Sequence, residues 1–177
     1  MRRAGDEQFA VEYELDPPAG DASADRWLNG RMCFVVGGVA IGDARRTISL
    51  NAATVAAKEL LANRGRRSAP ELMQEPARSI FRIVFGALSE DADQSDEQVA
   101  SDWKKYSRLY GLARGLEVFD DWDAFLVEDA VQARYIWRHA SKPGSPVSEQ
   151  VLRPGQFDDV LEAFIGELRL AAPGIVE

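Results

Sequence analysis

Three carboxylates lie close together in the sequence, at Asp120, Asp121 and Asp123. A hydrolase that works with paired acids needs one carboxyl group in a dry environment and a second that is ionised. These three acids fall in a predicted turn between two strands, where water keeps carboxylates ionised. We therefore favour a solvated acidic turn, and a carboxylate- or metal-dependent hydrolase that uses these three residues is the alternative.

A second group of acids has part of the spacing of a calcium-binding loop. Asp91, Asp93 and Ser95 occupy its first, third and fifth positions, and Asp102 occupies the twelfth. The sixth position is Asp96, where the sharp turn needs glycine, and the twelfth lacks the bidentate glutamate. We therefore expect no calcium site here, and we expect no other metal or cofactor in this chain.

Other residues that could do chemistry have simpler explanations. His139 is the only histidine, and it falls at the end of a predicted helix, where a cation suits the helix dipole. The run GGVAIG at 37–42 lacks both the glycine spacing of the dinucleotide fingerprint and the lysine of the phosphate loop. Glycines 37 and 38 are better explained as a hairpin turn. Cys33 lies in an apolar run and is predicted to be a buried strand residue. No catalytic residue is predicted.

The distribution of charge is more informative than any single motif. The formal net charge is -8, and each of the segments 90–102 and 117–129 contains six acids and no base. Acidic surface disfavours nucleic acid and anionic membranes as partners and attracts a basic protein. The residues predicted to bind such a partner are Asp91, Asp93, Asp96, Glu97, Asp120, Asp121, Asp123 and Glu128.

A basic segment is the second candidate for partner binding. Residues 44–82 contain eight bases and three acids, and Arg64, Arg66 and Arg67 flank a glycine within it. This cluster is predicted to be an exposed loop. If it binds the partner instead, the partner must carry an acidic patch.

The elements that must position these residues mix strands and helices without a regular βαβ alternation. Period-two and apolar runs predict strands at 9–15, 27–36, 39–41, 116–119, 124–127 and 147–152. Helical spacing and capping residues predict helices at 51–63, 76–86, 95–110 and 129–140, and a last helix after 154–155. We therefore expect an α+β fold, in which helices pack on an antiparallel sheet of about five or six strands.

Residues 1–177 are expected to form a single domain, with flexible ends at 1–7 and 171–177. Hydrophobic residues make up 46% of the chain, which is ordinary for a globular protein. The longest apolar stretch, at 32–41, is too short to span a bilayer. No apolar segment follows Arg2 and Arg3, so no signal peptide is predicted. We expect a cytoplasmic protein.

Side-chain burial is also predicted at several positions. Trp27 is expected in the core. The helix at 95–110 is expected to bury Val99, Trp103, Tyr106 and Tyr110, and the helix at 129–140 is expected to bury Val131, Ala133, Ile136 and Trp137.

Short motifs, taken in order, resemble a known family. They are WLNG at 27–30, IGD at 41–43, SL at 49–50, NR at 63–64, FDDW at 119–122 and LRPGQFD at 152–158. Their order and spacing resemble immunity protein family 42 of bacterial polymorphic toxin systems. The resemblance covers about residues 9–168, but the stretch 87–115 matches no family landmark.

The resemblance implies a non-enzymatic protein that binds the C-terminal domain of a cognate toxin, one to one, and blocks it. Such a protein is encoded beside the toxin, works in the cytoplasm and is expected to be monomeric when free. The acidic surface suggests a basic nuclease as the toxin, and an adaptor in a secretion pathway is a third possibility. Gly30, Gly42 and Asp43 match the family pattern, but we interpret them as turn residues without a binding role.

Overall fold

The first sheet is formed by the N-terminal part of the chain. The computed structural model describes residues 1–17, 27–89, 94–113, 115–142 and 144–172. The strands of this sheet are β1 (Arg2–Gly5), β2 (Phe9–Leu15), β3 (Asn29–Val36), β4 (Val39–Ile41) and β5 (Ile48–Ser49). They are antiparallel, in the order β1-β2-β3-β4, and β5 pairs with the other end of β3. Gly37 and Gly38 have φ of 55° and 82°, which confirms the predicted hairpin turn between β3 and β4.

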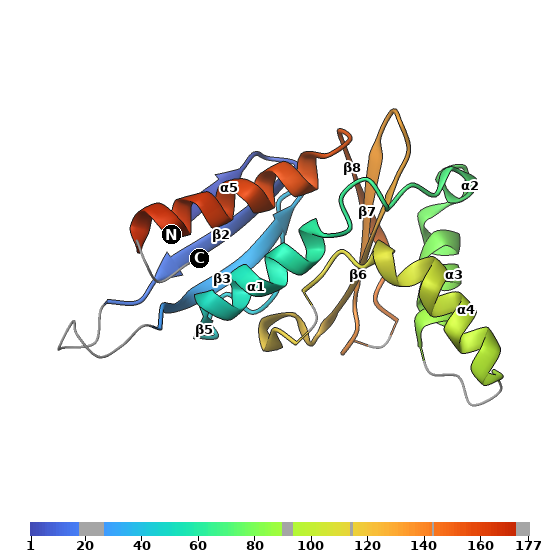
Figure 1. Ribbon diagram of the computed structural model, residues 1–177, viewed down its shortest axis with the longest axis horizontal. Coiled ribbons are helices and arrows are strands. Elements are labelled where there is room, and N and C mark those ends of the chain that lie inside the picture. The colour runs from blue at the N-terminus through green and yellow to red at the C-terminus, as the bar shows by residue number, and fades with distance from the viewer. Residues whose placement is uncertain (18–26, 90–93, 114, 143, 173–177) are drawn as a thin grey trace.

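Two helices cover one face of this sheet (Figure 1). They are α1 (Leu50–Leu61) and α5 (Gln156–Ala171), both near their predicted positions. Ser49 caps α1, because its hydroxyl accepts a hydrogen bond from the Ala52 N–H at 3.3 Å. The Tyr13 ring on β2 packs edge-on against Phe164 of α5, with centroids 5.3 Å apart.

The second sheet contains β6 (Trp122–Glu128), β7 (Ala133–His139) and β8 (Ser148–Leu152). These strands are antiparallel, in the order β6-β7-β8. Three helices lie on its far side in Figure 1: α2 (Pro70–Met73), α3 (Ala77–Leu88) and α4 (Asp96–Tyr106). The 3₁₀ turns η1 (Ser107–Leu109) and η2 (Glu117–Phe119) precede β6.

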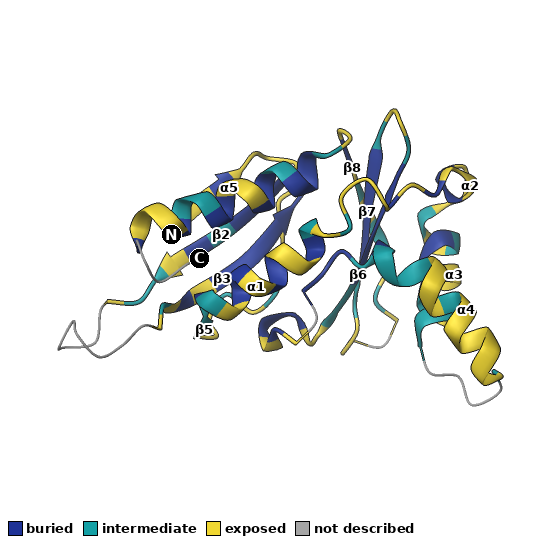
Figure 2. Cartoon of the chain, in the orientation of Figure 1, coloured by how far each residue is buried: buried dark blue, intermediate teal, exposed yellow. Residues whose placement is uncertain are grey.

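Successive side chains of β6 point to opposite faces of the second sheet, and both faces are apolar. Ala124 and Leu126 belong to the larger core, which also holds residues of the first sheet and of α5. Phe125 and Val127 belong to a smaller core with buried residues of α3. The second sheet is therefore covered on both faces, and most of its residues are dark blue in Figure 2.

The predicted fold class is confirmed as α+β with antiparallel strands. The described strands are divided between two sheets, of five and three strands. β1 lies within the N-terminal end that was predicted to be flexible, where it pairs with β2 from Arg2↔Tyr13 to Gly5↔Ala10. Residues 173–177 of the other predicted flexible end lie outside the described residues.

The helix predicted at 129–140 is wrong, because this segment forms a tight turn followed by β7. The Asp129 carboxylate accepts hydrogen bonds from the N–H groups of Val131 and Gln132, both at 2.8 Å, and this turn reverses the chain. β7 then runs between β6 and β8, and its residues from 133 to 137 are all buried. Because both of its faces are covered, β7 has no polar–apolar alternation that could reveal a strand. The strand predicted at 116–119 is likewise replaced, by η2.

Four predictions of burial are wrong. Trp27 is 67% exposed, and on α4 Trp103 is 46% exposed and Val99 is 40% exposed. Val131 is also exposed, in the turn before β7, whereas Ala133, Ile136 and Trp137 are buried as expected. Cys33 is buried in β3, and burial raises the pKa of its thiol to about 11. None of the helices in the described ranges combines the length and apolar character that crossing a membrane requires.

Candidate functional site

The predicted acidic residues that the structure describes lie in different elements of the fold. Asp91 and Asp93 lie outside the described residues, whereas Asp96 and Glu97 lie exposed in the first turn of α4. Ser95 caps this helix by accepting a hydrogen bond from the Gln98 N–H, as its sequence predicted. Acidic side chains in a first turn also complement the helix dipole, so these two acids have a structural role as well as an exposed position.

Asp120, Asp121 and Asp123 lie together where η2 leads into β6, but they have different surroundings. Asp120 is exposed and makes no ion pair within the described part of the chain. Asp121 accepts a hydrogen bond from the Ser141 hydroxyl, and Asp123 pairs with Arg138 at 2.9 Å. Across the described residues, no group of three or more acidic, thiol or imidazole side chains is arranged to hold a metal ion.

Glu128 was predicted to be part of an exposed binding surface, and this prediction is wrong. Only 9% of the residue is exposed, because alternation along β6 places it on the same inner face as Ala124 and Leu126. Burial raises the pKa of its carboxyl group above the ordinary value, and the nearby charge of Arg67 opposes this shift. Its Oε1 atom has no hydrogen-bond partner among the described residues. Glu128 is therefore part of the interior.

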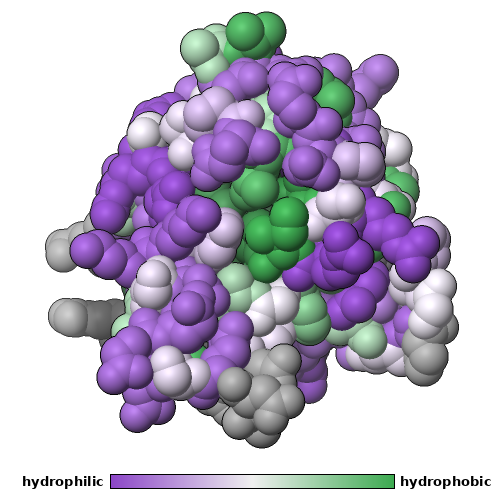
Figure 3. Space-filling view, turned by 90° about the vertical axis from the view of Figure 1, so that its right-hand side faces the viewer, coloured by the Kyte–Doolittle hydropathy of each residue, from purple (hydrophilic) through white to green (hydrophobic). Residues whose placement is uncertain are grey.

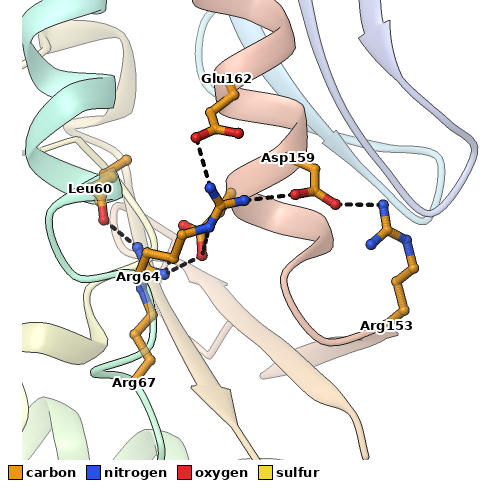
Figure 4. Close-up of polar contacts among 7 residues, drawn as sticks. Leu60, Arg64, Arg67, Arg153, Asp159 and Glu162 are labelled. Carbon is orange, nitrogen blue, oxygen red and sulfur yellow. Dashed lines mark hydrogen bonds and ion pairs between the residues drawn. The ribbon is translucent and has the colours of Figure 1, made fainter.

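The basic segment forms an exposed turn at Arg64, Gly65 and Arg66, as predicted, but Arg67 is buried, and two of its arginines pair with α5 (Figure 4). Arg64 bridges Asp159 and Glu162, each at 2.7 Å. Arg67 is fully buried and pairs with the buried Asp158 at 2.9 Å. Arg67 also donates a hydrogen bond to the carbonyl of Leu60. These arginines attach the segment after α1 to the start of α5.

His139 lies at the end of β7, not at a helix end as predicted. Its ring packs against Trp122, its cross-strand partner, with ring centroids 4.6 Å apart. Asp43 accepts a hydrogen bond from the Arg45 N–H at 3.1 Å, as expected of a turn residue. Gly42 also matches its prediction, because its φ of 109° requires a glycine-like backbone. Gly30, in contrast, lies within β3 and not in a turn.

Asp120 and Asp123 lie at the edge of a mostly apolar hollow of about 300 Å³. The end of α3 forms one wall, with Phe85 and Leu88, and the start of β6 forms another, with Trp122. The remaining lining residues that can be described are Ser89, Tyr110, Leu112, Ala113, Gly115, Leu116, Phe119, Ala124 and Phe125. An apolar hollow with a carboxylate at its edge suits a long basic side chain, which has an apolar stem and a cationic head.

The sequence placed Asp120 and Asp121 correctly in a turn, whereas Asp123 lies in β6, and the sequence did not reveal the wall opposite these acids. Phe85 lies on α3, 35 residues before Asp120 in the chain. It follows Phe81 by one helical turn, so the two rings lie on the same side of α3. Phe81 is buried, whereas Phe85 is only half-buried because it lies at the edge of the small core. A half-covered aromatic residue at the end of an apolar helix was the available signal.

The geometry therefore defines an α+β protein with an acidic, apolar-lined recess and with arginine–carboxylate pairs that stabilise its fold. The family model described as Immunity protein 42 matches residues 4–167, so the chain belongs to this family of immunity proteins. Its fold is also that of a solved structure titled CdiI from Burkholderia dolosa AUO158, with a TM-score of 0.67. That likeness covers 94% of this chain and 99% of the other, at 17% sequence identity. Among curated proteins, no match was found.

Proposed function

We propose that this protein neutralises a cognate toxin domain by binding it one to one in the cytoplasm of the cell that makes both. The observation that carries this proposal is the family match over residues 4–167. The shared fold with a structure titled CdiI agrees with a role in contact-dependent inhibition. The protein is monomeric before it meets the toxin.

Neutralisation proceeds by contact, without a catalytic step of the immunity protein. The surroundings of the acidic turn support this part of the proposal. Asp123 is engaged by Arg138 and Asp121 by Ser141, so these two carboxylates already hold the turn in place. Asp120 is exposed beside the hollow, a position that suits the recognition of a charged group on another protein.

The toxin-binding surface includes the acidic turn at Asp120, Asp121 and Asp123, and the toxin is a basic nuclease. The net charge of -8 supports a basic partner, since opposite charges steer two proteins toward each other. Asp91, Asp93, Asp96 and Glu97 extend the acidic sequence around α4 and contribute to the same long-range attraction.

Protection of cells is the first test. The C-terminal domain of the toxin encoded immediately upstream is expressed from an inducible promoter, with and without this protein. We expect growth only when both are made, and a purified complex of one copy of each protein by light scattering. Equal killing in the two strains would refute the proposed function.

Association kinetics test the acidic surface. Asp91, Asp93, Asp120 and Asp121 are changed to Asn, while Asp123 is kept because of its pair with Arg138. The matched control changes Glu7, Glu14, Glu59 and Glu71, which are exposed elsewhere, to Gln. Both variants lose four negative charges, and the amide oxygen of Asn at position 121 can still accept the Ser141 hydrogen bond, so the variants differ mainly in where the charge is removed.

We expect the first variant to associate with the toxin domain at least about tenfold more slowly than the control at low salt. The difference should shrink near 0.15 M salt, where the reach of a charge falls to about 8 Å. Equal rates for the two variants, with binding retained, would show that the toxin docks on another surface.

A further inference from the structure

Phe85 lines the acidic hollow and also lines a second, basic groove. This groove has a volume of about 850 Å³ and runs between α3 and the segment that leads into β8. Phe81 and Phe85 contribute aromatic surface to it, and Arg78, Arg82 and Arg138 contribute positive charge. The described residues that line it include no acid. In a chain with a net charge of -8, such a concentration of arginine is unexpected.

Two of these arginines are available to a partner. Arg78 and Arg82 are exposed on α3 and make no ion pair within the described ranges. This separates them from Arg64 and Arg67, which are already paired with carboxylates of α5. An exposed arginine without a carboxylate can form paired hydrogen bonds with the carboxylate of another protein.

The surface around these helices combines apolar and charged areas. Figure 3 looks onto the side of the molecule where α3 and α4 lie, and it shows apolar surface at the centre of a hydrophilic surround. Phe85 is half-buried at the end of the small core, and Ile83 on the same helix is 36% exposed. Apolar surface inside a polar rim is the usual arrangement of a protein–protein interface.

One ion pair connects the acidic hollow with the basic groove. Asp123 lines the hollow and Arg138 lines the groove, and the two side chains are 2.9 Å apart. The Arg138 guanidinium also lies 4.8 Å from the ring centres of both Phe81 and Phe85. Contact with two rings and a carboxylate holds this guanidinium in place. The boundary between negative and positive surface is therefore fixed at Phe85.

We propose that the hollow and the groove form one docking surface, on which the toxin places a basic side chain against the hollow and an acidic side chain against the groove. This inference rests on the proposed function and specifies the toxin surface that it requires. Asp120 receives the basic side chain, and Arg82 with Arg78 receives the acidic one. Phe85 packs under the toxin between these two contacts.

An interface with opposite charges on its two halves determines the orientation of the partner. A toxin turned end for end would place like charges together, and such contacts cost binding free energy. Net charge alone would attract any basic protein, whereas this pattern selects a partner with matching charges in the matching order. The surface therefore accounts for specificity as well as attraction.

Charge reversals on the full-length protein test the proposal, with the C-terminal domain of the upstream toxin as the probe. Asp120→Lys and Arg82→Glu are made singly and together. The double variant keeps the net charge of -8 but inverts the charge pattern. The control double variant, Glu14→Lys with Arg169→Glu, makes the same exchange at exposed positions that line neither the hollow nor the groove.

We expect each single reversal to weaken binding by about tenfold or more, and the double variant to bind more weakly than either. The control should bind within about twofold of wild type. Circular dichroism and thermal melting confirm that each variant is folded. Phe85→Ala, followed in the same way, should also weaken binding by at least about tenfold, because buried aromatic residues dominate interface energies.

The outcomes distinguish this inference from the function on which it rests. If the wild-type protein neither binds nor protects, the proposed function is wrong. If wild type protects while the folded double reversal binds equally well, this docking surface is wrong and the function stands. Loss of binding by Asp120→Lys without any effect of Arg82→Glu would also overturn the proposal, since it requires both halves.

Discussion

Removal of the buried carboxylate of Asp158 should destabilise the fold strongly. Its side chain is 1% exposed, and that of its partner Arg67 is 0% exposed. Both carboxylate oxygens accept hydrogen bonds from Arg67 Nη1, at 2.9 and 3.1 Å. Arginine does not lose its proton in proteins, so Asp158→Asn leaves a buried positive charge without its hydrogen-bonded counter-charge, and only the Glu128 carboxyl remains nearby. A buried pair that loses one partner costs about 3–5 kcal/mol, which is a large share of the stability of a domain.

Other contacts of Arg67 limit the expected cost to the lower half of this range. The Leu60 carbonyl still accepts its hydrogen bond, and the guanidinium carbon still lies 5.2 Å from the ring centre of Phe157. The amide oxygen of the new asparagine can also accept one hydrogen bond. We therefore expect Asp158→Asn to lower the free energy of unfolding by about 3 kcal/mol.

Urea denaturation at pH 7 measures this loss, and the next residue supplies the matched control. Asp159 pairs with Arg64 and Arg153, but its side chain is 44% exposed. Asp159→Asn should therefore cost no more than about 1 kcal/mol. Losses of equal size for the two variants would refute the reasoning, because they would mean that burial does not raise the cost of the broken pair. Arg67→Met, Asp158→Leu and Glu128→Gln combined should recover most of the loss, since these three changes together remove the buried charges of this cluster.

Two further predictions concern stability. Glu128→Gln should raise the urea midpoint of unfolding at pH 7 and leave it unchanged below about pH 4. The pKa of the Glu128 carboxyl group is raised in the folded state, so this group stabilises the fold most when it is protonated and loses that contribution to stability as pH rises. Equal midpoint shifts at both pH values would contradict this. Gly42→Ala should cost about 1–3 kcal/mol, since φ is 109° and a Cβ atom would lie 2.9 Å from Val118 and 3.0 Å from Phe119. Gly38→Ala is the control in the same denaturation assay, because Gly38 also has a positive φ but a Cβ atom there would have no other atom within 4 Å. An equal loss of unfolding free energy for the two variants would rule out the collision at Gly42.

Elements whose signals are local could be predicted from the sequence. Ser95 caps α4 at the predicted start of that helix, and Gly37 with Gly38 forms the predicted hairpin turn. α5 shows its apolar face with helical spacing, and it begins directly after residues 154–155, as predicted. In each case, the residues that determine the structure lie within a few positions of one another.

Features that depend on distant partners could not be predicted in this way. Arg67 stands among other arginines and resembles a solvated loop residue, but its partner Asp158 lies 91 residues further along the chain. Glu128 was assigned to an acidic surface because β6 was expected to end at Val127. One more residue of strand pairing, Glu128↔Ala133, turns the Glu128 carboxylate into the interior. Sequence patterns give the charge of these residues, whereas the packing of the sheets decides where the charge lies.

The acidic turn and the buried Arg67–Asp158 pair lie near opposite ends of β6. Asp123 is near the beginning of the strand and Glu128, beside the Arg67 pair, is at its end. Seven residues of strand span roughly 20 Å, which exceeds the reach of about 8 Å that a charge has at physiological salt. A change of charge at Asp120 therefore has little effect on the Arg67–Asp158 pair. The proposed docking surface could therefore change its charges while the buried ion pair maintains the fold.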